Sequence, residues 1–103
     1  MTVLSTVPAV TVEICGDLDL PTVARVREQL DDALSCRPTR LVVDLSRCDF
    51  VDASALAMLL EVHRRMARTG GVLTLAGCSP RVLRLLSLTG LKRVFDLADD
   101  SAA

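Results

Sequence analysis

Hydrophobic residues recur along this 103-residue chain with two spacings, one typical of strands and the other typical of helices. Alternating or continuous aliphatic runs predict strands over 10–14, 41–45 and 72–76. The run at 41–45 is almost entirely aliphatic, so we expect a central strand that is covered on both faces of its sheet. A β-branched edge strand is predicted over 2–7, ending at Pro8, and a short last strand is predicted within 91–97.

Apolar residues at i, i+3 and i+4 predict three helices between these strands. The first begins at Leu20-Pro21 and is stopped by Arg37-Pro38, and the second spans roughly 53–68 before two glycines. The third follows Ser79-Pro80, and its predicted inward residues are Val82, Leu83, Leu86 and Leu88. This order predicts an α/β fold with a mixed, mostly parallel sheet of four to five strands and three helices. We expect one domain over 1–103, with a disordered tail from about residue 98.

Composition and charge exclude several classes of function. Half of the residues are hydrophobic, the only aromatic residues are Phe50 and Phe95, and the net charge is −1. A chain with few aromatic residues and no excess of positive charge is not expected to bind nucleic acid. We find neither a signal-peptide pattern nor a run of about 20 apolar residues, so we expect a cytoplasmic protein that is not bound to a membrane.

The candidate chemistry lies in the loops that follow the predicted strands, where parallel α/β folds place their functional residues. These loops hold Asp17, Asp19, Asp49, Asp52 and Ser54. Paired carboxylates can indicate acid–base catalysis or a divalent metal site, but Asp is also common in turns and helix caps. We favour caps and turns, and we expect no metal ion and no cofactor.

No catalytic arrangement is visible in the sequence. His63 is the only histidine, and the helical rise places it roughly 13 Å from Ser54 along the axis, too far for a nucleophile–base pair. No glycine-rich phosphate-binding loop is present. We therefore expect that the chain is not an enzyme.

Four cysteines lie far apart in the sequence, at Cys15, Cys36, Cys48 and Cys78, without a Cys-x-x-Cys pair. In a cytosolic protein such cysteines are expected to be reduced. Because Cys15, Cys48 and Cys78 each lie near the end of a predicted strand, a thiol-based redox module stays open as an alternative function.

Asp52 and Ser54 stand at the start of the second predicted helix. The Asp52 carboxylate is positioned as an N-cap that accepts from the backbone N–H of residue 54 or 55. Ser54 falls in the first turn, near free N–H groups and the positive end of the helix dipole, where a phosphate would be tolerated. The structural alternative is a small residue that merely suits a helix start.

Three segments together resemble a known family: Gly16-Asp17-Leu18-Asp19, Val42-Val43-Asp44-Leu45-Ser46 and Phe50-Val51-Asp52-Ala53-Ser54-Ala55-Leu56-Ala57. In their order and spacing they resemble the STAS domain, and more closely the bacterial anti-sigma factor antagonists. The family pattern Asp-Ser-Ser-Gly-Leu-Gly is matched at its second Ser by Ser54. Ala53 replaces the first Ser, and Ala55 and Ala57 replace the glycines. The resemblance also implies a closing C-terminal helix, which we expect to be missing or truncated in this chain.

The resemblance implies a protein that binds an anti-sigma factor, a GHKL-type serine kinase, and thereby frees a sigma factor. The kinase would phosphorylate Ser54 and a PP2C-type phosphatase would reverse the modification. The residues implied to contact the partner are Asp17, Asp19, Asp49, Asp52, Ala53, Ala55 and Leu56. A second reading within the same family is a STAS subunit of a lipid-transport ABC complex.

Overall fold

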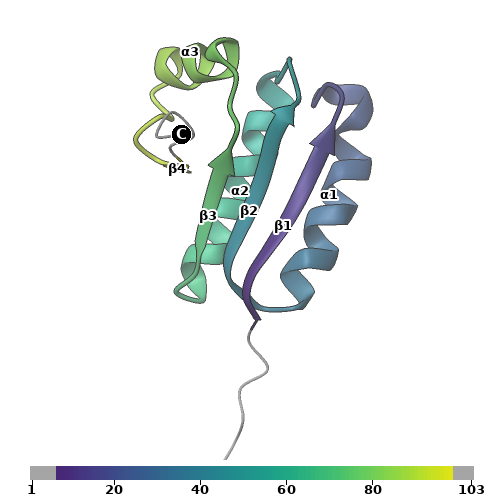
Figure 1. Ribbon diagram of the computed structural model, residues 1–103, viewed down its shortest axis with the longest axis vertical. Coiled ribbons are helices and arrows are strands. Elements are labelled where there is room, and N and C mark those ends of the chain that lie inside the picture. Colours follow the sequence, from purple (N-terminus) through teal and green to yellow (C-terminus); the bar gives the residue numbers. More distant parts are fainter. Residues whose placement is uncertain (1–6, 99–103) are drawn as a thin grey trace, which may run out of the picture.

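A computed structural model describes residues 7–98, which form a four-stranded sheet and three helices (Figure 1). The strands are β1 (Val7–Cys15), β2 (Pro38–Arg47), β3 (Val72–Ala76) and β4 (Asp96–Leu97). The helices are α1 (Leu20–Ser35), α2 (Ala53–Arg68) and α3 (Pro80–Leu88). The strand order is β1-β2-β3-β4, and each neighbouring pair is parallel.

This architecture confirms the predicted α/β class. The bounds of α2 and β3 agree with the prediction, while β2 extends beyond the predicted 41–45 at both ends and β4 is a two-residue strand. Ala98, where we predicted the tail to begin, donates its N–H to the carbonyl of Leu75 at 2.9 Å. Residues 99–103 lie outside the described part of the chain.

The predicted strand break at Pro8 is wrong. Residues 2–6 of that predicted strand lie outside the described residues, but Val7 and Pro8 belong to β1. Within residues 7–98, β1 pairs only with β2, so it is an edge strand, where a residue without an N–H is tolerated. The Pro8 carbonyl also accepts a hydrogen bond from the Thr39 hydroxyl on the neighbouring strand.

Helices α1 and α2 cover one face of the sheet, and α3 lies beyond the carboxyl end of β3 (Figure 1). Leu41, Val43 and Leu45 of β2 point into the core between this face and the helices, and all three are buried. Val42 and Asp44 point to the other face and are only half-buried. Our expectation that β2 is covered on both faces is therefore wrong for the described residues, since no helix among them packs on that second face.

Aliphatic side chains build the core, and charged pairs join the outer surfaces of the two covering helices. Leu30 of α1 and Leu59 of α2 are buried in the core. Outside it, Arg65 lies 2.7 Å from Asp31, and Arg27 pairs with Glu61. Exposed ion pairs of this kind contribute about 0.2–1 kcal/mol each, so burial of the aliphatic core is the larger stabilising effect. No helix within residues 7–98 has the length and apolar character needed to cross a membrane.

Candidate functional site

The loops that follow β1 and β2 are joined to each other by backbone hydrogen bonds. The N–H of Leu18 donates to the carbonyl of Phe50 at 2.9 Å, and the N–H of Asp52 donates to the carbonyl of Leu18 at 3.1 Å. Leu18 and Val51 form an isolated parallel bridge, and both side chains are buried in the core. The two loops are therefore an ordered continuation of the sheet, and they bring the predicted site residues together.

The loop after β3 approaches the same edge. Gly77 has a φ of +67°, and a Cβ placed there would lie 2.7 Å from the Cβ of Ser46. A side chain at position 77 would collide with β2 as well as strain the backbone. Glycine at this position therefore lets the chain leave β3 close to β2 and enter α3, whose first turn Ser79 caps by accepting from the N–H of Val82 at 3.2 Å.

The carboxylate of Asp52 serves the first turns of two helices. Its Oδ1 accepts from the N–H of Ala55 at 3.0 Å, which confirms Asp52 as the N-cap of α2. Its Oδ2 accepts from the N–H of Leu20, the first residue of α1, at 2.9 Å. The N–H groups at a helix start have no partner within the helix, so this single side chain satisfies one such group in each helix. Sequence reasoning had not found the second bond.

Ser54 donates its hydroxyl to Oδ1 of Asp52 at 2.6 Å. The same oxygen accepts from the N–H of Ala55, so the hydroxyl lies in the first turn of α2, and its bond to the capping carboxylate is a contact that the sequence does not predict. The hydroxyl of Ser54, followed by the N–H of Ala55, lowers the pKa of Asp52 below its usual value. Ser54 itself is half-buried.

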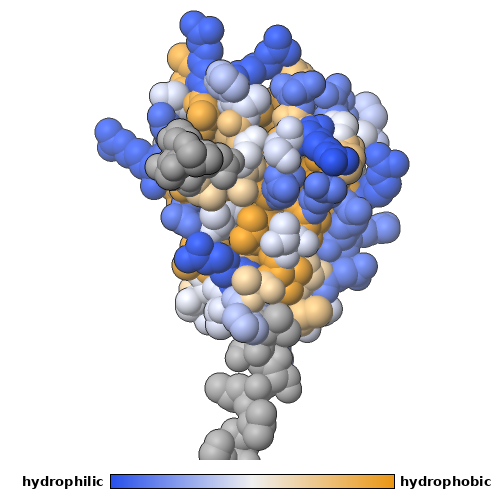
Figure 2. All heavy atoms as spheres, in the orientation of Figure 1, coloured by the Kyte–Doolittle hydropathy of each residue, from blue (hydrophilic) through white to orange (hydrophobic). Residues whose placement is uncertain are grey.

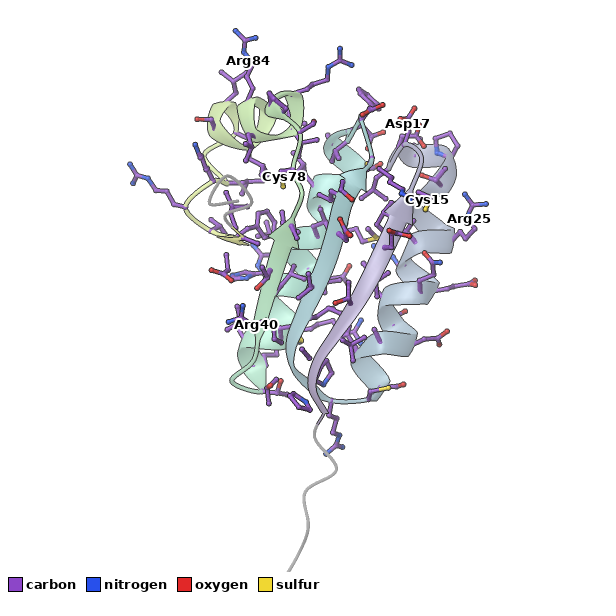
Figure 3. All side chains as sticks on the ribbon, in the orientation of Figure 1. Cys15, Asp17, Arg25, Arg40, Cys78 and Arg84 are labelled. Carbon is purple, nitrogen blue, oxygen red and sulfur yellow. The ribbon has the colours of Figure 1, made fainter. Side chains whose placement is uncertain are left out.

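The acidic residues of the site differ in role. Asp17 and Asp49 are exposed, one on each of the joined loops (Asp17 is labelled in Figure 3). Asp19 is the N-cap residue of α1, and its backbone N–H donates to the hydroxyl of Thr22 at 3.0 Å. Caps and turns thus account for Asp19 and Asp52, whereas Asp17 and Asp49 are available to a partner.

The three apolar residues predicted to contact a partner are unequally accessible. Ala53 is exposed at the first position of α2. Ala55 is fully buried, and Leu56 is 6% exposed. The methyl group of Ala55 therefore packs in the core, so Ala53 is the member of this trio that presents its side chain most openly.

The four cysteines differ in how accessible they are. All four lie within the described residues, and none of them is in a disulfide bond. Cys48 is buried, and its thiol donates to the carbonyl of Phe50 at 3.3 Å. Burial raises the pKa of the Cys48 thiol, and the nearby Asp17 and Asp49 carboxylates raise it further. A thiol held protonated in this way is a poor nucleophile. Cys15 and Cys36 are exposed, and Cys78 is half-buried.

His63, the only histidine of the chain, contacts an aromatic ring. The ring of His63 packs edge-on against Phe95, with 5.8 Å between the ring centroids. Within residues 7–98, no group of three or more His, Cys, Asp and Glu side chains is arranged to hold a metal ion.

An apolar groove beside the start of α2 was not predicted from the sequence. It has a volume of about 420 Å³ and lies between α2 and α3. Its apolar lining includes Phe50, Val51, Leu56, Val82, Leu85 and Leu88, and Arg81 and Arg84 also border it. Leu88, which we predicted to point inward, is 77% exposed, so that prediction is wrong. The sequence does carry a sign of this groove: four leucines lie within the last six residues of α3, which is a wider apolar surface than one buried helix face requires.

Comparison with known proteins identifies the family. A family model described as "Mlab, STAS domain" matches residues 1–98. The chain belongs to the STAS domain family. The three helices and the four-stranded parallel sheet of the described residues agree with this membership.

Several proteins similar to this chain are named anti-sigma factor antagonists. It is 31% identical over 90 residues to an anti-sigma F factor antagonist of Paenibacillus polymyxa, covering 86% of this chain and 77% of that protein. An anti-sigma factor antagonist structure from Mycobacterium paratuberculosis superposes with a TM-score of 0.79 at 25% identity, covering 91% of this chain and 81% of the other.

The fold is also that of the anti-sigma factor antagonist SpoIIAA. Its unphosphorylated form has a TM-score of 0.75 at 22% identity, covering 99% of this chain and 88% of SpoIIAA. Its phosphorylated form has a TM-score of 0.67 at 21% identity, with 99% and 91% covered. These relatives belong to a regulatory family, which is not a family of enzymes.

The shared role of Asp52 predicts an unequal cost of removing two helix caps. Ser79 caps only α3, whereas Asp52 accepts from both α1 and α2. We expect Asp52→Ala to lower the midpoint of chemical denaturation more than Ser79→Ala, because more donors lose their acceptor. Equal midpoints for the two variants would show that the bond from Leu20 to Asp52 does not stabilise the fold.

The lowered pKa of Asp52 predicts how this contribution depends on pH. A carboxylate whose pKa is lower in the folded state stabilises the fold fully above its unfolded pKa of about 3.9. That contribution is lost as the pH falls through the folded value. The difference in unfolding free energy between wild type and Asp52→Asn should therefore be constant near neutral pH and shrink below about pH 4. The wild-type protein must still be folded at the lowest pH that is measured. If the difference stays constant down to pH 3 or below, the hydrogen bonds to the Asp52 carboxylate do not stabilise the fold.

Proposed function

We propose that this protein is an anti-sigma factor antagonist that binds its anti-sigma factor through the start of α2 and the two loops beside it. The observation that carries the proposal is the position of Ser54, whose hydroxyl lies in the first turn of α2 and donates to the capping carboxylate of Asp52. The exposed Asp17, Asp49 and Ala53 surround this position. The names of the relatives support the same role, and binding would release a sigma factor in the cytoplasm.

The switch that we propose is phosphorylation of Ser54 by the anti-sigma factor, acting as a GHKL-type serine kinase with ATP and Mg²⁺. The Ser54 oxygen bonds to the γ-phosphorus of ATP, the bond to the bridging oxygen breaks, and ADP leaves. The hydroxyl proton passes to a base of the kinase or to water. A PP2C-type phosphatase would hydrolyse the phosphoserine and restore the binding form.

Phosphorylation changes both the charge and the hydrogen bonding of this site. It removes the hydroxyl that donates to Asp52 and adds about −1.5 to −2 charges next to that carboxylate. Repulsion from Asp52 favours a phosphate that turns outward, toward the surface that the partner would contact. The positive end of the α2 dipole tolerates the added charge, so the domain keeps its fold while the partner loses a matching surface.

The alanines that replace family residues near Ser54 are compatible with this role. Ala55 stands where the family has glycine, and its methyl group is accommodated in the core without exposure. Ala favours the helical conformation over Gly by about 1 kcal/mol, so the replacement stabilises the first turn of α2. The acceptor serine is retained at position 54.

The experiment that tests the proposal is intact-mass analysis after incubation with GHKL-type anti-sigma factors from the genome that carries this chain, with ATP and Mg²⁺. We expect one added phosphate on the wild-type protein and none on Ser54→Ala. The matched control is Ser87→Ala, which removes an exposed serine of α3. This variant should be phosphorylated like the wild type.

Two results would contradict this account. A phosphate on Ser54→Ala would place the acceptor elsewhere. A stable complex without phosphate on any variant would indicate an antagonist that is not switched, or a STAS subunit that docks on an ATPase.

A further inference from the structure

The groove between α2 and α3 has the features of a docking surface. Phe50 on one side of it is 44% exposed, and Leu88 on the other is 77% exposed. Figure 2 shows hydrophobic side chains among hydrophilic ones at the α3 end of the visible face. Both of these large apolar side chains line the groove, and a large part of each is still exposed to solvent. A protein segment that lies along the groove would cover both.

Two arginines give this surface a positive edge. Arg81 and Arg84 are exposed, and neither makes an ion pair within residues 7–98. By contrast, the guanidinium groups of Arg27 and Arg65 are held by carboxylates on the neighbouring helix. Arginine recognises carboxylates with two parallel hydrogen bonds, so this pair favours a partner that carries Asp or Glu.

The groove is continuous with the site around Ser54. Asp52 and Ala53, at the start of α2, line one end of it. The acidic residues Asp17 and Asp49 flank the α2 start from the joined loops, and Figure 3 shows Asp17 and Arg84 at the same end of the molecule. The surface thus has an acidic flank, the start of α2 with Ser54 in its first turn, and an apolar groove with a basic edge.

We propose that this groove binds an amphipathic helix of the anti-sigma factor. Apolar side chains of that helix contact Phe50, Leu85 and Leu88, and an Asp or Glu on it pairs with Arg81 or Arg84. This inference rests on the function proposed above and adds a specific second contact region to it.

The charges around the groove argue against two other occupants. A second copy related by a two-fold axis through the groove would bring the unpaired arginines of both copies close together, with unfavourable repulsion. An anionic membrane would meet the carboxylates of Asp17 and Asp49 at the same end of the molecule.

The test measures the dissociation constant of the anti-sigma factor for the unphosphorylated protein and its variants. We expect Arg84→Glu and Arg81→Glu each to weaken binding about tenfold or more, since each places a like charge against the partner's carboxylate. The matched control is Arg64→Glu, which makes the same charge change at an exposed position of α2 outside the groove, and it should change the constant less than about twofold. Leu88→Ala, which alters an exposed side chain and should leave stability nearly unchanged, should also weaken binding several-fold.

A photo-crosslinking residue at position 88 identifies the occupant directly. We expect mass spectrometry to find it joined to an amphipathic segment of the anti-sigma factor that contains Asp or Glu. A segment without a carboxylate, or Arg84→Glu binding as tightly as Arg64→Glu, would overturn the groove proposal.

The failure of this inference can be told apart from that of the proposed function. If Ser54 is phosphorylated and the partner binds, but Arg81, Arg84 and Leu88 have no effect on binding, the groove proposal alone is wrong. If no anti-sigma factor binds the wild-type protein, both the proposed function and the groove proposal are wrong.

Discussion

The carboxylate of Asp52 is the contact on which the geometry of the site depends. It accepts from the first residue of α1 and from the third residue of α2, the two helices that cover the sheet. Backbone bonds between the preceding loops hold this carboxylate in place, since the N–H of Asp52 donates to Leu18. The starts of both helices are therefore fixed relative to one another and to the carboxyl edge of the sheet. A partner that binds at this edge meets an already ordered surface, so little conformational entropy is lost on binding.

The hydroxyl of Ser54 bonds to the same carboxylate, which explains why a small chemical change there could have a large effect. A phosphate on Ser54 would replace a hydrogen-bond donor with negative charge, next to the carboxylate that accepts from the first turns of both helices. The dipole of α2 compensates part of that charge, so the effect falls on the exposed surface more than on the core. A coupling of about 1–3 kcal/mol between phosphorylation and binding changes affinity about 5–150-fold, which is enough for a switch without any change of fold.

Local signals in the sequence account for what could be predicted. Asp52 before an amphipathic run, and the glycine pair after it, define both ends of α2, and the aliphatic run at 72–76 defines β3. The site residues were expected together because parallel strands bring their following loops to one edge. The bond from Leu20 to Asp52 could not be predicted in the same way, because it joins residues 32 positions apart and depends on the relative placement of two loops. The exposure of Leu88 likewise depends on how α3 is oriented. The position of Pro8 inside β1 could not be predicted either, because a proline is tolerated there only if β1 lies at the edge of the sheet, and that depends on the order of the strands.

The central claim is that the charge state of Ser54 controls binding while the fold is retained. The most direct measurement is the dissociation constant of one anti-sigma factor for the unphosphorylated protein and for protein fully phosphorylated on Ser54, with thermal unfolding of both forms recorded in parallel. We predict affinity at least about fivefold weaker for the phosphorylated form, with cooperative unfolding preserved. Equal affinities for the two folded forms would contradict the account.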